Sequence, residues 1–194
     1  MTEQPPIQPT PVGAFRFNTD SAKLEYFDGN QYVNITTDSP EANTGGTRGL
    51  FGGGATPSDG VDTIDFVNIS TTGNATDFGN LSLARDLLSA CASRTRAFWA
   101  GGVNPGVAGL NEVDTVVISS RGNATDFGDL TEASRGIGAA SSCTRAVFAN
   151  GDPGYSADID YVQIATTGNG VDFGDSTQAR RGSAGCSNGH GGLG

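Results

Sequence analysis

Short runs in which hydrophobic and polar residues alternate return at regular intervals along this chain. In IDFVNIS, VDTVVIS and IDYVQIA, two aliphatic residues share one face of each run: Val67 and Ile69, Val116 and Ile118, Val162 and Ile164. The opposite faces carry Phe66, Thr115 and Tyr161. A period of two residues is typical of a β-strand. Because both faces include apolar residues, we expect these strands to be covered on two sides.

Two independent landmarks set the length of the repeat. The glycines that open GNATDFG, its second copy and GNGVDFG are spaced by 49 and 46 residues, at Gly73, Gly122 and Gly168. The arginines of a Thr-Arg pair that precedes two apolar residues are spaced by 48 and 49, at Arg48, Arg96 and Arg145. Both landmarks indicate a unit of about 48 residues that is used three times.

Each repeat contains four runs that predict short strands. The first run, in RGLFGGG, RAFWAGG and RAVFANG, ends in small residues, as a buried strand before a close turn does. The alternating run is the second. The third run carries an aspartate, which we expect to hold a turn, and a phenylalanine, which we expect to plug the core: Asp77 and Phe78, Asp126 and Phe127, Asp172 and Phe173. The fourth run, in DLLSACAS, GIGAASS and GSAGCSN, consists mainly of small residues.

The array begins and ends out of phase with this unit. The first repeat enters at Arg48 without a small-residue run, and the last repeat continues past Arg180 into one. We therefore expect three strands, then four, then four, then one, with the last strand placed to complete the first group. Four short strands per repeat predict β-propeller blades ahead of a β-solenoid or a sandwich. Three blades are fewer than usual, which leaves open a compact closure, a ring of several chains and a longer array.

The order of these strands resembles kelch repeats, in which a double glycine closes the second strand of each blade. The double glycine is present as Gly53–Gly54 and Gly101–Gly102, whereas the third repeat has Asn150–Gly151 and phenylalanine replaces the family's tryptophan. Over residues 47–194 the variant is similar to repeats in virion structural proteins of marine cyanophages. The resemblance implies an all-β fold of about three kelch-like β-propeller blades.

The first 40 residues follow another pattern. AFRFN, KLEYF and QYVNI predict three strands, with turns at residues 18–22 and at Asp28–Gly29. About 25 residues cannot form a self-sufficient core, so we expect this module to pack against copies of itself or another structure. The stretch GAFRFNTDSAKLEYFDGNQYVNIT is similar to a small β module of phage fibre and appendage proteins.

Three segments are therefore expected. The prolines of EQPPIQPTPVG favour an extended arm over residues 1–12, either an anchor or a disordered terminus. A small β module for anchoring or oligomerisation follows over residues 13–40. The kelch-like repeat domain occupies residues 41–194.

Charge and hydropathy narrow the function classes. The formal net charge is -10, and phosphate binding requires clustered Lys and Arg, so we expect no nucleic acid partner. No run approaches the roughly 18 apolar residues of a membrane span. The N-terminus lacks the basic start and apolar core of a secretory signal. We expect a chain made in the host cytoplasm that does not insert into a membrane.

Residues suited to catalysis are few. His190 is the single histidine, so neither a Ser-His-Asp set nor the His and Tyr ligands of a kelch-type copper oxidase can be assembled. We expect no enzyme activity and no cofactor. The cysteines Cys91, Cys143 and Cys186 show no CxxC spacing, and we interpret them as buried free thiols ahead of metal ligands or a disulfide.

The repeated charged residues have two possible roles. Asp77, Asp126 and Asp172, with Asp129 and Asp175 three residues later, have oxygens that calcium accepts, but aspartate beside glycine also stabilises turns, and we favour the turn role. The arginines at 48, 96 and 145 recur together with Asp65, Asp114 and Asp160. This pattern predicts ion pairs between blades or hydrogen bonds to turn carbonyls. A glycan or phosphate site is the alternative for the arginines.

The segments between the double glycine and the second strand vary most. They comprise residues 55–61, 103–112 and 152–157. Variable loops on one face of a repeat fold often form its binding rim, although ordinary loop drift explains the variation equally well. The candidate rim residues are Pro57, Asp59, Asn104, Pro105, Asn111, Pro153 and Tyr155.

These observations and the resemblance together predict a non-enzymatic phage virion protein, in a tail fibre, an appendage or a capsid decoration. The expected partners are other virion proteins, copies of the chain itself, with a trimer as first guess, and a host cell-surface glycan. The alternative is a carbohydrate-binding, lectin-like propeller for host attachment.

Overall fold

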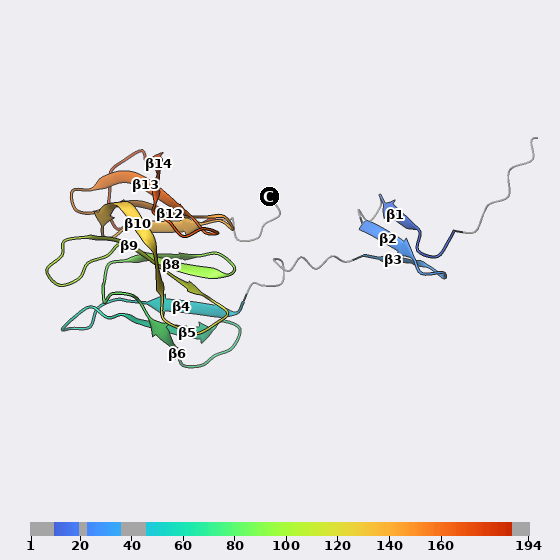
Figure 1. Ribbon diagram of the computed structural model, residues 1–194, viewed down its shortest axis with the longest axis horizontal. Coiled ribbons are helices and arrows are strands. Elements are labelled where there is room, and N and C mark those ends of the chain that lie inside the picture. The colour runs from blue at the N-terminus through green and yellow to red at the C-terminus, as the bar shows by residue number, and fades with distance from the viewer. Residues whose placement is uncertain (1–9, 20–22, 36–45, 188–194) are drawn as a thin grey trace, which may run out of the picture. The chain divides into compact units, whose positions relative to one another are not determined.

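The computed structural model describes residues 10–19, 23–35 and 46–187. Within these residues the chain is all-β, as predicted, with strands β1 to β14 and no helix (Figure 1). Contacts divide the chain into two units, Met1–Ser39 and Pro40–Gly194. Of the expected extended arm only residues 10–12 are described, and His190 lies outside the described part.

The N-terminal unit is a small antiparallel sheet at the three places where the sequence predicts strands. Its order is β1-β2-β3, with β1 (Phe15–Asn18), β2 (Lys23–Phe27) and β3 (Tyr32–Asn34). The carboxylate of Asp28 accepts hydrogen bonds from the amides of Asn30 and Gln31, each at 2.8 Å. These bonds close the turn between β2 and β3, because an aspartate side chain there replaces a backbone acceptor.

The second unit contains three antiparallel sheets, one per repeat, called here the first, second and third sheets. The first sheet has the order β4-β5-β6: β4 (Arg48–Gly52), β5 (Thr63–Asn68), β6 (Thr76–Asn80). The second has the order β10-β9-β8-β7: β7 (Ser89–Ala92), β8 (Arg96–Ala100), β9 (Leu110–Val117), β10 (Thr125–Ser134). The third has the order β11-β12-β13-β14: β11 (Gly138–Ser141), β12 (Arg145–Gly151), β13 (Ser156–Gln163), β14 (Val171–Asp175).

The motif GNATDFG forms a turn followed by a β-bulge. In the first sheet Asp65 pairs with Asp77 and Ile64 pairs with Gly79, so Phe78 is an extra residue in β6. The second and third sheets have the same irregularity at the equivalent phenylalanines. A bulge turns the strand locally and re-aims one side chain. The glycine that follows has a positive φ in all three sheets, which explains the repeated Asp-Phe-Gly triplet.

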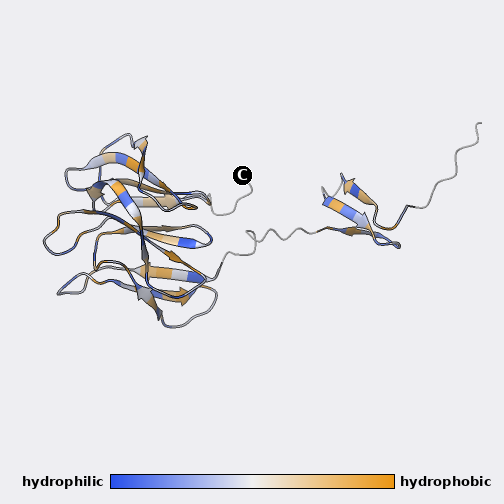
Figure 2. Cartoon of the chain, viewed as in Figure 1, coloured by the Kyte–Doolittle hydropathy of each residue, from blue (hydrophilic) through white to orange (hydrophobic). Residues whose placement is uncertain are grey.

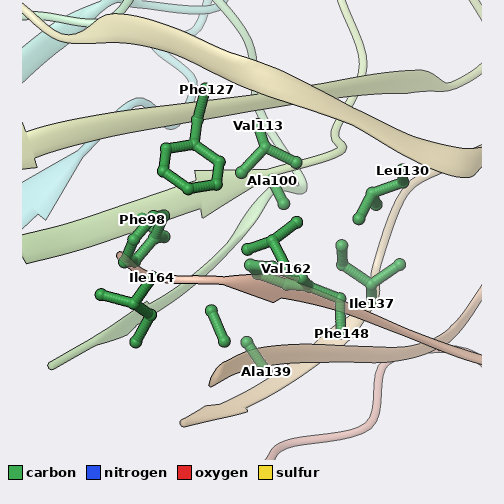
Figure 3. Packing of buried hydrophobic residues seen from close by; sticks show 11 residues of the cluster. Phe98, Ala100, Val113, Phe127, Leu130, Ile137, Ala139, Phe148, Val162 and Ile164 are labelled. Atoms are coloured by element: carbon green, nitrogen blue, oxygen red, sulfur yellow. The ribbon is translucent and has the colours of Figure 1, made fainter. Parts of the chain in front are cut away.

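The hydrophobic core lies between neighbouring sheets. One cluster joins Phe78 of the first sheet to Trp99 of the second. The other cluster joins the second sheet to the third (Figure 3), and its labelled members are Phe98, Ala100, Val113, Phe127, Leu130, Ile137, Ala139, Phe148, Val162 and Ile164. Hydrophobic and hydrophilic residues are mixed along the strands (Figure 2). Each sheet therefore depends on its neighbour for burial.

Two predictions about the ends of the array are wrong. Phe173 does not plug a core: its side chain is 54% exposed, whereas Phe78 and Phe127 are buried. Residues 182–187 do not form the predicted last strand, and the first sheet keeps three strands. Both departures lie at an end of the array: within the described residues, Phe173 has no sheet beyond it, and residues 182–187 have no strand to pair with.

The cysteines are free, but only Cys91 is sheltered as predicted. Burial raises the pKa of its thiol to about 12. Cys143 and Cys186 are exposed, so the prediction of buried thiols is wrong for them. Cys143 lies in the turn between β11 and β12, and Cys186 lies beyond the last strand.

Candidate binding site

Two of the three variable loops meet at a shallow groove on the second unit. The loop between β4 and β5 contributes residues 55–60, and the loop between β8 and β9 contributes Val103 to Pro105 and Val107. Asp86 and Arg135, which precede the second and third sheets, complete the lining. The groove has a volume of about 390 Å³. Of the predicted rim residues, it brings together Pro57, Asp59, Asn104 and Pro105.

The first loop is held by its own hydrogen bonds. The amide of Thr56 donates to the carbonyl of Asp59 at 2.8 Å, and the Thr56 hydroxyl donates to the same oxygen at 2.9 Å. Both residues are exposed, so these bonds shape the loop without shielding it. The carboxylate of Asp59 thus stands at the groove on a turn of defined shape.

The double glycine brings this loop close to the connection between the sheets. Gly53 has a φ of 69°, and a Cβ there would lie 2.8 Å from the carbonyl oxygen of Arg85. The amide of Gly54 donates to that same carbonyl at 3.0 Å. A side chain at residue 53 would separate the two segments, which explains why glycine occupies it.

The second loop is tied to the same connection. Asp86 and Val103 exchange two backbone hydrogen bonds, of 3.0 and 2.8 Å. The side-chain amide of Asn104 donates to the carbonyl of Ala84 at 2.6 Å. One donor of Asn104 therefore supports the loop, and the same residue lines the groove.

The third loop is joined to the groove through Arg135. The Arg135 guanidinium donates two hydrogen bonds to one carboxylate oxygen of Asp152, at 2.9 and 2.7 Å. Arg181 approaches the same oxygen at 3.4 Å and lies over the ring of Tyr155 at 5.2 Å. The hydrogen bond from Arg135 holds the pKa of Asp152 below its ordinary value, and the carboxylate therefore stays charged.

The structure places the remaining predicted rim residues apart from the groove lining. Asn111 is the second residue of β9, so the second variable loop ends before it. Pro153 follows Asp152, and Tyr155 is 55% exposed on the third loop. Sequence comparison among the three repeats did not indicate Asp86, Arg135 or Arg181, because these positions lie outside the segments that vary in length.

A buried ion pair lies beneath the first loop. Arg85 and Asp114 are both almost fully buried, and Arg85 Nη2 lies 3.1 Å from Asp114 Oδ2. The pKa of Arg85 is lowered by burial, an effect that the charges of Asp114 and Glu112 oppose. The guanidinium also donates to the carbonyl of Trp99 at 3.2 Å. This pair joins the first and second sheets and is not accessible to a ligand.

The repeated arginines contact neighbouring sheets, away from the loops. Arg48 Nη1 donates to the carbonyl oxygen of Ile118 at 2.6 Å, and Arg96 Nη1 donates to that of Ile164 at 3.1 Å. Arg145 is exposed at the end of the array. Arg48 and Arg96 therefore have one of the roles considered for them, because each makes a hydrogen bond to a carbonyl of the next sheet.

The repeated aspartates shape the backbone. The carboxylates of Asp126 and Asp172 accept hydrogen bonds from the amides two residues later, at 2.9 and 2.7 Å. This is the side-chain-to-backbone bond expected of a turn-forming aspartate. Among the residues that the structure describes, no group of three or more His, Cys, Asp or Glu is arranged to hold a metal ion.

Comparisons with known proteins give no direct assignment. The sequence matches no protein-family model and no curated protein. In the described ranges, no helix is long and apolar enough to cross a membrane.

The groove combines carboxylates, one guanidinium and apolar edges. Asp59 and Asp86 supply acceptors, Arg135 supplies donors, and Pro57 with Val107 supplies apolar surface. Such a lining suits a ligand with many hydroxyl groups or a polar peptide, because both need donors and acceptors at short intervals. The groove is open and shallow, which favours recognition of part of a larger molecule.

Proposed function

We propose that this chain is a non-enzymatic phage virion structural protein, of a tail fibre, an appendage or a capsid decoration. Its sheets are kelch-like propeller blades, its N-terminal unit anchors or oligomerises the chain, and its partners are other virion proteins and copies of itself. The protein is made in the host cytoplasm and resides in the virion. One observation carries the proposal: the separate N-terminal sheet exposes a row of large apolar side chains.

This apolar row occupies one face of the N-terminal sheet. Phe15 pairs with Tyr26 and Phe17 pairs with Leu24, so the four side chains project on the same side. Phe15 and Phe17 are 67% and 62% exposed, and Leu24 and Tyr26 are 46% and 37% exposed. A small sheet of this kind gains stability when another apolar surface covers it. Anchoring or oligomerisation supplies that surface.

The opposite face of the same sheet is satisfied within the unit. Arg16 donates to Glu25 at 2.7 Å and lies over the ring of Tyr32, 3.6 Å from its centroid. The two faces therefore differ in kind, one closed by polar contacts and the other open and apolar. The open face is the one that we assign to assembly.

The experiment compares the intact chain with the double variant F15S/F17S by light scattering and by incorporation into particles. The wild-type chain is expected in purified phage particles that encode it, and the variant is expected to be depleted from them. The matched control V171S removes an exposed apolar residue from the repeat unit, where Val171 is 52% exposed. Absence of the wild-type chain from particles would contradict the virion assignment, whatever its oligomeric state.

A second candidate function is a carbohydrate-binding propeller for host attachment. The observation that favours it is the groove of Asp59, Asp86 and Arg135, whose donors and acceptors suit sugar hydroxyls. In a glycan-array experiment, binding by the wild-type chain and its loss in D59A/D86A would support this function. Binding that survives the double variant would place the glycan elsewhere, and an array without binding would leave the structural role as the proposal.

A further inference from the structure

The contacts between adjacent sheets are made twice in this chain with the same geometry. The amide of Gly122 donates to the carbonyl of Phe78 at 3.0 Å, where the second sheet meets the first. The amide of Gly168 donates to the carbonyl of Phe127 at 2.9 Å, where the third sheet meets the second. By the same spacing, the next bond in the series would join the amide at position 73 to the carbonyl of Phe173.

A hydrogen bond to an asparagine side chain also occurs at both junctions, next to the backbone hydrogen bond. The amide of Asn80 donates to the side-chain oxygen of Asn123 at 3.1 Å, and the amide of Asp129 donates to that of Asn169 at 3.2 Å. The equivalent pair is Asp175 and Asn74. These two lie at opposite ends of the array, in the third and first repeats, so a single open chain leaves the pair unmade.

The arginine contacts follow the same series. Arg48 and Arg96 each donate to a carbonyl of the next sheet. The next member is Arg145, and the carbonyl in its series belongs to Ile69. The side chain of Ile69 is 72% exposed, whereas its equivalent Ile164 is buried.

Exposed apolar side chains lie at the same two ends of the array. On the third sheet, Phe173 is 54% exposed, although its equivalents in the other sheets are buried. On the first sheet, Phe51 is 64% exposed, although its equivalents Trp99 and Phe148 are 2% exposed. Each end thus carries one half of the apolar contact that the two internal junctions complete.

The segment after the third sheet takes the path of an inner strand. The amide of Gly136 donates to the carbonyl of Leu87 at 2.8 Å, and the amide of Gly182 donates to the carbonyl of Gly136 at 2.7 Å. Leu87, Gly136 and Gly182 all have a positive φ, of 52°, 59° and 67°. The two connections between sheets and the segment after the third sheet therefore start in the same conformation.

The similarity continues along this segment. The Ser141 hydroxyl donates to the carbonyl of Ala92 at 2.7 Å, and the Ser187 hydroxyl donates to the carbonyl of Ser141. Residues 184–187 thus lie against β11 as β11 lies against β7. They are exposed, and they form no strand pair within the described residues. They correspond to the first strand of a further sheet.

The first sheet lacks the strand that this segment supplies. In the second and third sheets a small-residue strand pairs with β8 or β12, but one edge of β4 is unpaired within the described residues. Two grooves, of about 410 and 250 Å³, lie along β4 and β7. They are lined in part by Gly49, Leu50 and Phe51. A free strand edge beside a groove is suited to the addition of one more strand.

We propose that two copies of this chain dock end to end, residues 184–187 of each adding to the free edge of β4 in the other. The repeat register places Gly185 opposite Phe51 and Cys186 opposite Leu50, as Ala90 and Cys91 stand opposite Trp99 and Phe98. The docking continues the established contact between sheets, so its occupant is a second copy. This surface is separate from the N-terminal apolar face invoked above.

The charged residues at the two ends and the number of sheets both favour a second copy of the chain as the docking partner. Arg180 occupies the repeat position of Arg85, and Asp65 occupies that of Asp114, so the buried Arg85–Asp114 pair has its counterpart between copies. Each copy contributes three sheets. Two copies close a ring of six sheets, within the four to eight of propellers, whereas one or three copies fall outside that range.

A disulfide tests the register. In the F15S/F17S background, which removes association through the N-terminal unit, the variant L50C/C143S is expected to form a covalent dimer on mild oxidation through native Cys186. Directly opposite residues of an antiparallel pair have Cα atoms about 4.5–5.5 Å apart, within the range of a disulfide. The matched control L50C/C143S/C186S is expected to stay monomeric on a non-reducing gel. A cross-linked monomer, or no cross-link, would overturn the proposal.

A charge exchange tests the ion pair in the same background. R180D is expected to weaken self-association at least about tenfold in analytical ultracentrifugation, and R180D/D65R is expected to restore it. The control R94D changes an arginine at the turn before β8 and is expected to leave association unchanged. A monomeric F15S/F17S chain at all concentrations would refute end-to-end docking and would leave the virion assignment untouched. If D65R alone unfolds the chain, the disulfide experiment decides.

Discussion

Cys91 differs from the other two cysteines because neighbouring sheets cover it. Burial raises the pKa of its thiol to about 12, an effect that hydrogen bonds with Ser141 and the backbone of Val147 only partly oppose. The thiolate is the reactive form, so this cysteine is almost entirely unreactive near neutral pH. Cys143 and Cys186 have no such cover.

The expected outcome is two fast thiols and one slow thiol in a labelling experiment at pH 8 on the dilute chain, in which end-to-end docking does not cover Cys186. C143S and C186S are each expected to remove one fast thiol, and C91S is expected to remove the slow one. The slow thiol should become fast in denaturant, because unfolding abolishes the burial that protects it. Rapid labelling of Cys91 in the folded chain would contradict its placement between the sheets.

Asp152 links pH to stability through a lowered pKa. Arg135 donates to its carboxylate, so the folded-state pKa lies below the ordinary value of 3.8. A group of this kind stabilises the fold above its unfolded pKa, and the contribution is lost as pH falls through the lowered folded value. D152N is therefore expected to lower the melting temperature at pH 7.

The difference in melting temperature between wild type and D152N should shrink as pH falls below about 3.8, because protonation then removes from the wild-type chain the carboxylate charge that D152N already lacks. D59N changes an exposed loop carboxylate and serves as the control. A D152N effect that stays constant down to low pH would show that the ion pair is not its cause.

At the scale of elements, the β-bulges show why the Asp-Phe-Gly triplet recurs. A Cβ at Gly79 would overlap the carbonyl oxygen of Gly122, and a Cβ at Gly128 would overlap that of Gly168. A Cβ at Gly174, which has the same positive φ, has no neighbouring atom within 4 Å. All three glycines have a positive φ, which disfavours other residues, and a side chain at Gly79 or Gly128 would also clash with the neighbouring sheet.

The comparison of G79A, G128A and G174A separates these two effects. Backbone strain is expected to lower the free energy of unfolding of all three variants by roughly 1 kcal/mol. The clash between sheets is expected to lower that of G79A and G128A by about 2 kcal/mol more. Denaturant unfolding at low protein concentration, in the R180D background, measures the difference without association. Equal losses at the three glycines would contradict the close approach of the sheets.

At the scale of the whole molecule, the second sheet is the one with a neighbour on both sides. Its strands β8 and β9 contain the almost fully buried Phe98, Trp99 and Val113, while the end sheets expose Phe51 and Phe173. In a repeat array each unit gains stability from its neighbours, so the middle sheet is the most stable.

Hydrogen exchange should follow this order. Amides of β8 and β9 are expected to exchange slowest, and those of β4 and β14 fastest among the repeat strands, when the chain is dilute. At high concentration, end-to-end docking is expected to slow exchange in β4 and at residues 182–187. Uniform protection across the three sheets would argue against an open array.

Much of the element structure was predictable from the sequence, because it depends on local pattern. Alternation placed the strands containing Val67, Val116 and Val162, and the small-residue run placed β7 and β11. The candidate site was predictable only in part: Pro57, Asp59, Asn104 and Pro105 vary between repeats, but Asp86 and Arg135 reach the groove from other segments. Such proximity depends on how the sheets stack, which local pattern does not encode.

The sequence by itself determined the all-β class, the repeat length and the order of strands, because hydrophobic alternation and turn residues act over a few positions. Only the tertiary structure decided which of the repeated positions are buried against a neighbouring sheet. Phe78, Phe127 and Phe173 are equivalent in sequence, yet the first two are buried and the third is exposed. Burial depends on a neighbouring sheet, and the sheet that Phe173 requires is absent from the described part of the chain.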